Sequence, residues 1–93
     1  MMWKVTWSKH VEKQLDRIPE FIVSKFRDWA IAVETDGLLA TRKLPGLHDE
    51  PLRGERQGQR SVRLNRAYRV IYVEGARGEL QIVEVIEVNK HDY

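Results

Sequence analysis

Two arginines, Arg63 and Arg69, flank the short polar stretch Asn65-Arg66 in the second half of the chain. Apolar and polar residues alternate around each arginine, which predicts two antiparallel strands joined by a tight turn. In such a hairpin the two arginines lie across from each other or diagonal to each other. Two guanidinium groups this close repel unless an anion lies between them, and their planar forks of N–H donors suit a phosphate. The pair therefore predicts a phosphate site, unless Glu84 or Glu87 of the following strand neutralises it structurally.

Glu50 is a candidate general base for such a site. It precedes Pro51, which restricts the residue before it to extended backbone and so fixes the direction of the Glu50 side chain. A carboxylate among arginines is held ionised and can accept a proton. The alternative is a loop carboxylate that only balances charge.

The chain ends with residues that could supply the complementary acid. An imidazole titrates near neutrality, so His91 could donate a proton, and Asp92 beside it could hold or charge the ring. Tyr93 could stack on a nucleobase. A frayed, inert terminus is the alternative. His48, close to Glu50 in the sequence, is a weaker candidate for a functional part.

Basic residues concentrate in the middle of the chain. The formal net charge is only +2, but residues 38–72 carry eight basic residues against three acidic ones. Seven of the eight are arginine; the set is Arg42, Lys43, Arg53, Arg56, Arg60, Arg63, Arg66 and Arg69. Such a field predicts a polyanionic partner, nucleic acid first of all, and a solvated basic surface is the alternative.

The residue types exclude several other functions. The chain has no cysteine, so disulfides, thiolate zinc sites and cysteine nucleophiles are excluded. The three histidines lack the spacing of metal ligands and no glycine-rich phosphate loop follows a strand, so we expect neither a metal nor a cofactor. No apolar run could span a membrane, and we expect a cytoplasmic protein because the N-terminus lacks a signal-peptide pattern.

Hydrophobic periodicity predicts the elements that must position these residues. The expected elements are a strand at 2–7, helices at 9–18 and 19–35, and strands at 59–65, 67–74 and 79–88. Residues 38–58 show no sustained period and are expected to form an irregular loop, and a turn is expected at 74–78. The order β-α-α-β-β-β predicts one α+β domain over residues 1–93, with a helical hairpin packed on a small, mainly antiparallel sheet. The last strand, the most apolar, is expected at its centre.

Four stretches, taken in this order, resemble the RelE/ParE toxin superfamily, the toxin halves of bacterial type II toxin–antitoxin pairs. They are Asp49-Glu50-Pro51-Leu52-Arg53-Gly54, Gly58-Gln59-Arg60-Ser61-Val62-Arg63-Leu64, Ala67-Tyr68-Arg69-Val70-Ile71-Tyr72 and Val88-Asn89-Lys90-His91-Asp92-Tyr93. The size and the order of elements match this superfamily too, so the resemblance covers the whole chain.

The superfamily has two branches with different activities. RelE-, YoeB- and HigB-type members are messenger RNA interferases, most of them acting on the ribosome, whereas ParE-type members poison DNA gyrase without nuclease residues. The Glu-Pro-Leu-basic-Gly element of this chain resembles the YoeB and HigB side. The resemblance therefore implies a metal-independent endoribonuclease that inhibits translation. A gyrase inhibitor, and an inactive member that acts only as a partner, are the alternatives.

The resemblance also implies roles for residues of this chain. Glu50 would be the base that activates the 2′-hydroxyl, and Arg63 and Arg69 would contact the scissile phosphate. His91 and Tyr93 would protonate the departing 5′-oxygen and stack on a base, and which of them is the acid stays open. The residues expected to bind RNA are Arg53, Arg56, Arg60 and Lys90.

Partners follow from the same resemblance. A cognate antitoxin would cover or distort the site, and the complex of the two proteins would bind operator DNA through the antitoxin. The expected substrate is messenger RNA, in most members on the ribosome.

Overall fold

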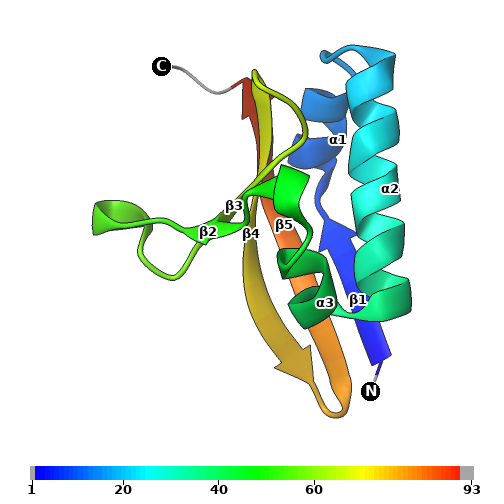
Figure 1. Cartoon of the computed structure of the whole chain (residues 1–93), viewed down its shortest axis with the longest axis vertical. Helices are drawn as coiled ribbons and strands as arrows, with labels where there is room; N and C mark the ends of the chain where they lie inside the picture. The colour runs from blue at the N-terminus through cyan, green and yellow to red at the C-terminus, as the bar shows by residue number, and fades with distance from the viewer. Residues whose placement is uncertain (1, 91–93) are drawn as a thin grey trace.

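The computed structural model of the chain describes residues 2–90 (Figure 1). Its elements in chain order are β1 (Met2–Trp7), α1 (Lys9–Leu15), α2 (Glu20–Asp36), α3 (Leu38–Arg42), the 3-10 turn η1 (Pro45–Leu47), β2 (Glu50–Pro51), the 3-10 turn η2 (Gly54–Arg56), β3 (Arg60–Arg63), β4 (Tyr68–Arg77) and β5 (Leu80–Lys90).

The five strands form one sheet in the order β1-β5-β4-β3-β2. β1 runs parallel to β5, and the other three neighbouring pairs are antiparallel. Helices α1 and α2 lie on one face of this sheet, and the segment that carries η2 projects from the opposite side (Figure 1). The predicted α+β fold with a mainly antiparallel sheet is confirmed. β5 is paired on both sides, but the middle of the sheet is β4, because the short β2 extends the sheet beyond β3.

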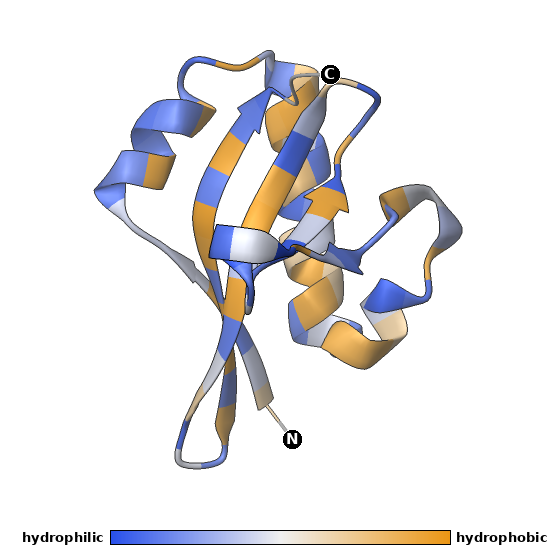
Figure 2. Cartoon of the chain, turned by 90° about the vertical axis from the view of Figure 1, so that its left-hand side faces the viewer, coloured by the Kyte–Doolittle hydropathy of each residue, from blue (hydrophilic) through white to orange (hydrophobic). Residues whose placement is uncertain are grey.

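The core lies between the helices and the sheet. Along the long strands apolar and polar residues alternate as bands (Figure 2), so one face of each strand turns toward the helices. Val62 and Val70, which are paired in the ladder of β3 and β4, are both fully buried on this face. The apolar stripe of α2 covers them; its buried residues are Ile22, Phe26, Trp29, Ala30 and Val33. The opposite face of β3 and β4 carries Ser61, Arg63 and Arg69, together with the buried Ile71.

The loop expected at residues 38–58 is more ordered than the sequence indicates. α3, η1, β2 and η2 all lie inside it, so the expectation of an irregular segment was wrong. Gly37 has a φ of 88°, a conformation that side chains disfavour, and its carbonyl accepts a hydrogen bond from the hydroxyl of Thr41 at 2.8 Å. This contact stabilises a helix of five residues, which is too short to show a hydrophobic period.

Two element ends also differ from expectation. α1 stops at Leu15 instead of residue 18, because the chain tightens there: the N–H of Arg17 bonds to the carbonyl of Gln14 at 3.1 Å. β4 continues through the turn expected at 74–78, because Gly75 and its two successors keep their partners in β5. The turn lies at residues 78–79. No helix within residues 2–90 is long and apolar enough to cross a membrane.

Replacing Glu34 with alanine should lower the free energy of unfolding by about 1–2 kcal/mol. β1 is an edge strand, and the backbone N–H of Val5 donates to Glu34 Oε2 of α2 at 2.9 Å. The substitution leaves this partly buried donor without a protein acceptor. Urea denaturation measures the effect, and Thr35→Ala, an exposed neighbour on the same helix, is the control. Equal stability of the two variants would contradict the prediction.

Candidate active site

Arg63 and Arg69 are direct partners in the ladder of β3 and β4. The side chains of residues directly opposite each other in an antiparallel pair project from the same face, so both guanidinium groups lie on one side of the sheet. Their chain neighbours Val62 and Val70 are buried under the helices, so both arginines lie on the face away from the helices. The predicted hairpin is confirmed, with the two arginines across from each other.

A side chain fixes the turn between the two arginines. Asn65 Oδ1 accepts hydrogen bonds from the backbone N–H groups of Ala67 and Tyr68, both at 2.8 Å. Such a contact between an asparagine and the backbone a few residues on stabilises a tight turn. Asn65 thereby sets the register that brings Arg63 opposite Arg69.

Neither guanidinium is neutralised by another described residue. Arg69 Nε is buried and has no hydrogen-bond partner, and among residues 2–90 no ion pair involves Arg63 or Arg69. Glu87, one of the two carboxylates that could have neutralised them, is 3.0 Å from Arg56 instead and also accepts from Asn89. A buried donor without a partner costs free energy, and an anion between the two forks would supply the missing acceptor.

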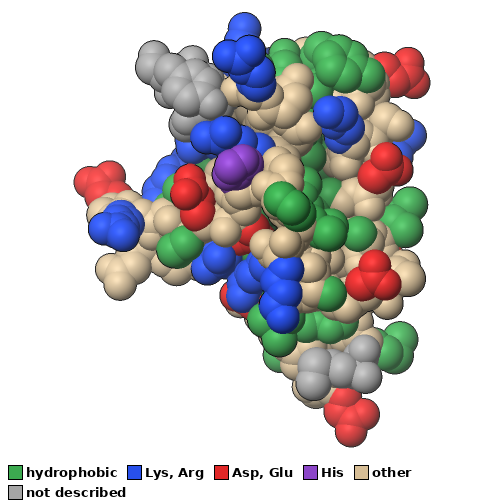
Figure 3. Space-filling view, in the orientation of Figure 1, with side chains coloured by type: hydrophobic (Ala, Val, Ile, Leu, Met, Phe, Trp, Pro, Cys, Tyr) green, Lys and Arg blue, Asp and Glu red, His purple; other side chains and the backbone are tan. Residues whose placement is uncertain are grey.

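Glu50 reaches the same face from the edge of the sheet. In β2 it pairs with Ser61, which lies two residues before Arg63 and so on the same face of β3. A small concavity of about 20 Å³ joins these side chains; it is lined by His48, Glu50, Ser61, Arg63, Asn65, Arg66, Tyr68 and Arg69. We call this concavity the anion site. On the side of the molecule where β2 and η2 project, Lys and Arg side chains gather with acidic ones among them (Figure 3).

The anion site therefore brings together three of the residues expected from the sequence, Glu50, Arg63 and Arg69. Ser61 was not among the expected site residues, although the alternation of β3 places it on the face of Arg63. His48, a weaker candidate from the sequence, also lines the site. His91 and Tyr93 lie outside the described residues.

The residues expected to bind RNA are spread over different places. Arg53 and Lys90 are exposed. Arg56 reaches the face of the anion site but is paired with Glu87. Arg60 does not join the anion site: its Nε donates to Asp49 Oδ1 at 2.7 Å, next to Tyr72. Its guanidinium is thus engaged on the helix-facing side of the sheet.

The buried carboxylate of Asp49 is the centre of a polar cluster on the helix-facing side of the sheet. The Asp49 side chain is 1% exposed, and besides the bond from Arg60 its Oδ2 accepts the hydroxyl proton of Tyr72 at 2.6 Å. Arg42 Nε lies 3.9 Å from Asp49 Oδ1, and the same guanidinium bonds to Glu74 at 2.5 Å. This cluster joins α3, β3 and β4 to the segment before β2.

The Tyr72 hydroxyl should make stability fall in alkali. Burial of the ring and the hydrogen bond to Asp49 raise the pKa of Tyr72 above its ordinary value of 10.0. Above pH 10 the unfolded chain ionises this group while the folded chain keeps the proton, so its contribution to stability, complete below pH 10, is lost as pH rises toward the folded pKa. The stability difference between the wild type and Tyr72→Phe should therefore shrink above pH 10, by up to about 1.4 kcal/mol per pH unit. Urea denaturation of both at pH 8.5 and pH 11 measures it, and a constant difference would contradict it.

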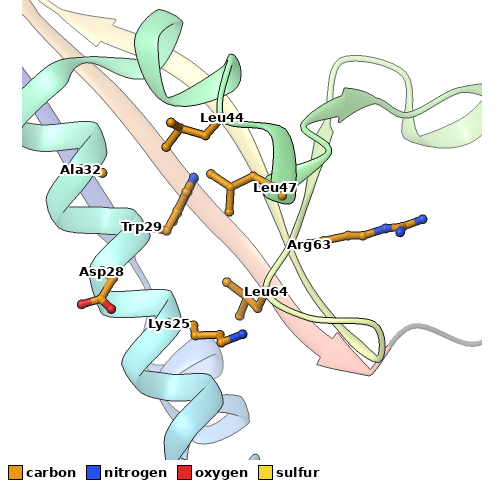
Figure 4. A pocket seen from close by; sticks show the side chains of 9 residues that line it. Lys25, Asp28, Trp29, Ala32, Leu44, Leu47, Arg63 and Leu64 are labelled. Atoms are coloured by element: carbon orange, nitrogen blue, oxygen red, sulfur yellow. The ribbon is translucent and has the colours of Figure 1, made fainter.

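A larger cavity lies elsewhere. It measures about 350 Å³ and opens between α2 and the segment of η1, with apolar side chains such as Trp29, Leu47 and Leu64 around it. Arg63 lines this cavity as well as the anion site, and Figure 4 shows its side chain pointing away from the apolar side chains of the cavity. The cavity and the anion site therefore share Arg63. Within residues 2–90 no group of three or more histidine, aspartate or glutamate side chains could hold a metal ion.

Known structures share this fold. The chain is similar to a YoeB/ParE toxin from Agrobacterium tumefaciens, with 24% identity, a TM-score of 0.73, and coverage of 96% of this chain and 99% of the other. It is similar to the toxin–antitoxin complex RelBE2 of Mycobacterium tuberculosis, with 23% identity, a TM-score of 0.68 and coverage of 98% and 100%. The archaeal RelE–RelB complex from Pyrococcus horikoshii OT3 gives 22% identity, a TM-score of 0.70 and coverage of 97% and 96%.

No curated protein sequence matches the chain. The model of one protein family does match, over residues 5–92, and its description is the ParE toxin of type II toxin–antitoxin systems, parDE. This match begins within β1, continues past the end of β5 and includes every residue of the anion site. The chain therefore belongs to the ParE toxin family, within the RelE/ParE superfamily that its motifs resemble.

Proposed function

We propose that the protein is the toxin of a type II toxin–antitoxin system and that it acts as an endoribonuclease on messenger RNA. The observation that carries this proposal is the convergence of Glu50 with the unneutralised pair Arg63 and Arg69 in one concavity. A base beside two guanidinium groups matches what cleavage of a phosphodiester by its own 2′-hydroxyl requires. A protein that only binds a partner needs none of these three groups in this arrangement.

In the proposed reaction Glu50 removes the proton of the 2′-hydroxyl, whose oxygen attacks the adjacent phosphorus. Arg63 and Arg69 stabilise the negative charge that develops on the phosphate oxygens. The bond from phosphorus to the 5′-oxygen then breaks, and His91 or Tyr93 protonates that oxygen. The products are a 2′,3′-cyclic phosphate and a 5′-hydroxyl, and no metal ion takes part. DNA lacks the 2′-hydroxyl and is not cut.

The proposed partners follow from the family and from charge. A cognate antitoxin neutralises the toxin, as two of the similar structures are toxin–antitoxin complexes, and operator DNA is bound through that complex. Messenger RNA is the substrate, on the ribosome and in the cytoplasm. Arg53 and Lys90, which are exposed, contact RNA phosphates other than the one that is cleaved. Arg56 also contacts a phosphate, and its ion pair with Glu87 breaks when it does. Arg60 has no place in this binding surface because Asp49 holds it.

Inhibition of DNA gyrase is the second candidate. The matched family is that of ParE toxins, and the ParE-type branch acts on gyrase without a nuclease site. The two candidates differ in what they require of Glu50, because gyrase binding needs no base.

Mapping of messenger RNA 5′ ends after expression of the protein tests the proposed function. We expect new 5′-hydroxyl ends within coding sequences and no loss of DNA supercoiling by gyrase in a purified assay. Uncut messenger RNA together with inhibited gyrase would overturn the nuclease assignment in favour of the second candidate.

A further inference from the structure

Residues 48–50 send alternate side chains to opposite sides of the sheet edge. His48 and Glu50 line the anion site, whereas the carboxylate between them, Asp49, is buried against Arg60 and Tyr72 on the helix-facing side. In extended backbone successive side chains point in opposite directions, and Glu50 belongs to the strand β2. The place of the Asp49 carboxylate therefore fixes where the Glu50 side chain can point.

The backbone at His48 adds a second observation. Its φ of 44° and ψ of 51° lie in the left-handed region, which residues other than glycine adopt uncommonly. A conformation of this kind persists only where the surroundings determine it, and such residues cluster at functional sites. His48 lies between η1 and β2, and the next residue along is the buried Asp49.

The contacts of Asp49 come from elements that are themselves held in the fold. Arg60 belongs to β3 and Tyr72 to β4, and the Tyr72 ring packs against Trp29 of α2 with ring centroids 5.6 Å apart. Each carboxylate oxygen has its own donor, at 2.7 Å and 2.6 Å. A shift of the segment would leave a buried carboxylate oxygen without its donor, which is costly.

We propose that Asp49 is a positioning residue of the anion site: its buried carboxylate fixes residues 48–50 so that Glu50 and His48 stand beside Arg63 and Arg69. This inference rests on the proposed function, because it assigns a purpose to the placement of Glu50. The arginine pair is set by the β3–β4 hairpin and does not depend on Asp49. Loss of the Asp49 carboxylate should therefore displace the proposed base, Glu50, and leave Arg63 and Arg69 in place to contact the phosphate.

Asp49→Asn tests this proposal, because it keeps the shape of the side chain and removes one acceptor oxygen and the charge. We expect kcat for RNA cleavage to fall by about 30- to 100-fold, since displacement of a reacting group by about 1 Å costs this much. KM should change by less than about threefold, because the guanidinium pair is unaltered. Hydrogen exchange of the amides at 48–52 should become faster, while exchange in β4 stays as in the wild type.

Glu74→Gln is the matched control. It removes a carboxylate from the same cluster, where Glu74 bonds to Arg42, but it leaves the hydrogen bonds of Asp49 to Arg60 and Tyr72 in place. Its kcat should equal that of the wild type. If Asp49→Asn does not fold, Tyr72→Phe removes one of the two short bonds to Asp49 and should show the same pattern with a smaller fall in kcat.

Two results would overturn the proposal. One is a kcat of Asp49→Asn equal to the wild type when Glu50→Gln is inactive. The other is a fall in kcat of the same size in Asp49→Asn and in its control Glu74→Gln. If the wild-type protein cuts no RNA, the proposed function fails, and the positioning role of Asp49 is then tested by hydrogen exchange alone. Unchanged exchange of the amides at 48–52 in Asp49→Asn overturns that role. Faster exchange there supports it.

Discussion

Replacing Arg69 with alanine should lower the rate of RNA cleavage by about 100- to 1,000-fold and abolish growth arrest. Arg69 stands opposite Arg63, and its Nε has no partner within the described chain, so its donors are free to meet charge that develops on a phosphate. The fold should survive, because the substitution removes no protein hydrogen bond of this side chain and relieves repulsion between like charges. The free energy of unfolding should change by less than about 1 kcal/mol. Cleavage of an RNA oligonucleotide and urea denaturation measure the two effects.

Arg77→Ala is the matched control for this experiment. Arg77 is an exposed arginine at the far end of the same strand, opposite Leu80. It changes the net charge by the same amount but lies away from the anion site. Equal losses of activity in both variants would mean that overall charge matters and that the arginine pair has no special part.

Glu50→Gln should lower kcat by about 100- to 10,000-fold and leave RNA binding within about twofold of the wild type. Glutamine keeps the size of the side chain and its place opposite Ser61 but cannot take a proton from the 2′-hydroxyl. Because the arginine pair stays intact, affinity for the phosphate is retained. Single-turnover cleavage and fluorescence anisotropy with a labelled RNA separate the two quantities.

Glu55→Gln controls for the loss of one negative charge near the site, since Glu55 is an exposed residue of η2 in the segment that follows β2. Its kcat should be that of the wild type. A Glu50→Gln variant with more than about a third of the wild-type kcat would show that another group acts as the base.

The arginine pair could be predicted from sequence because its geometry is local. Alternation in two adjacent segments and a polar turn at Asn65 determine which residues of a hairpin face each other. The same alternation places Arg60 on the face of Val62, toward the helices. Its assignment to RNA binding followed from the family resemblance and took no account of the face of the strand on which it lies.

The placement of Glu50 could not be predicted from periodicity. β2 has only two residues, too few to show a period, and its pairing with Ser61 joins segments separated by a loop. Proline after Glu50 fixed only the local backbone. The burial of Asp49 depends on Arg60 and Tyr72, which lie 11 and 23 residues further along the chain. Contacts between residues this far apart in the sequence position the site residues, and they produce no pattern within a short window of neighbouring residues.

The most direct test of the central claim compares two RNA oligonucleotides, one of them with a single 2′-deoxynucleotide on the 5′ side of the mapped cut, with and without ribosomes. If Glu50, Arg63 and Arg69 promote attack by the 2′-hydroxyl, the all-RNA strand is cut there and ends in a 2′,3′-cyclic phosphate, and the substituted strand stays intact at that position. Equal cutting of both strands at that position, or a product that ends in a 3′-hydroxyl, would contradict the account.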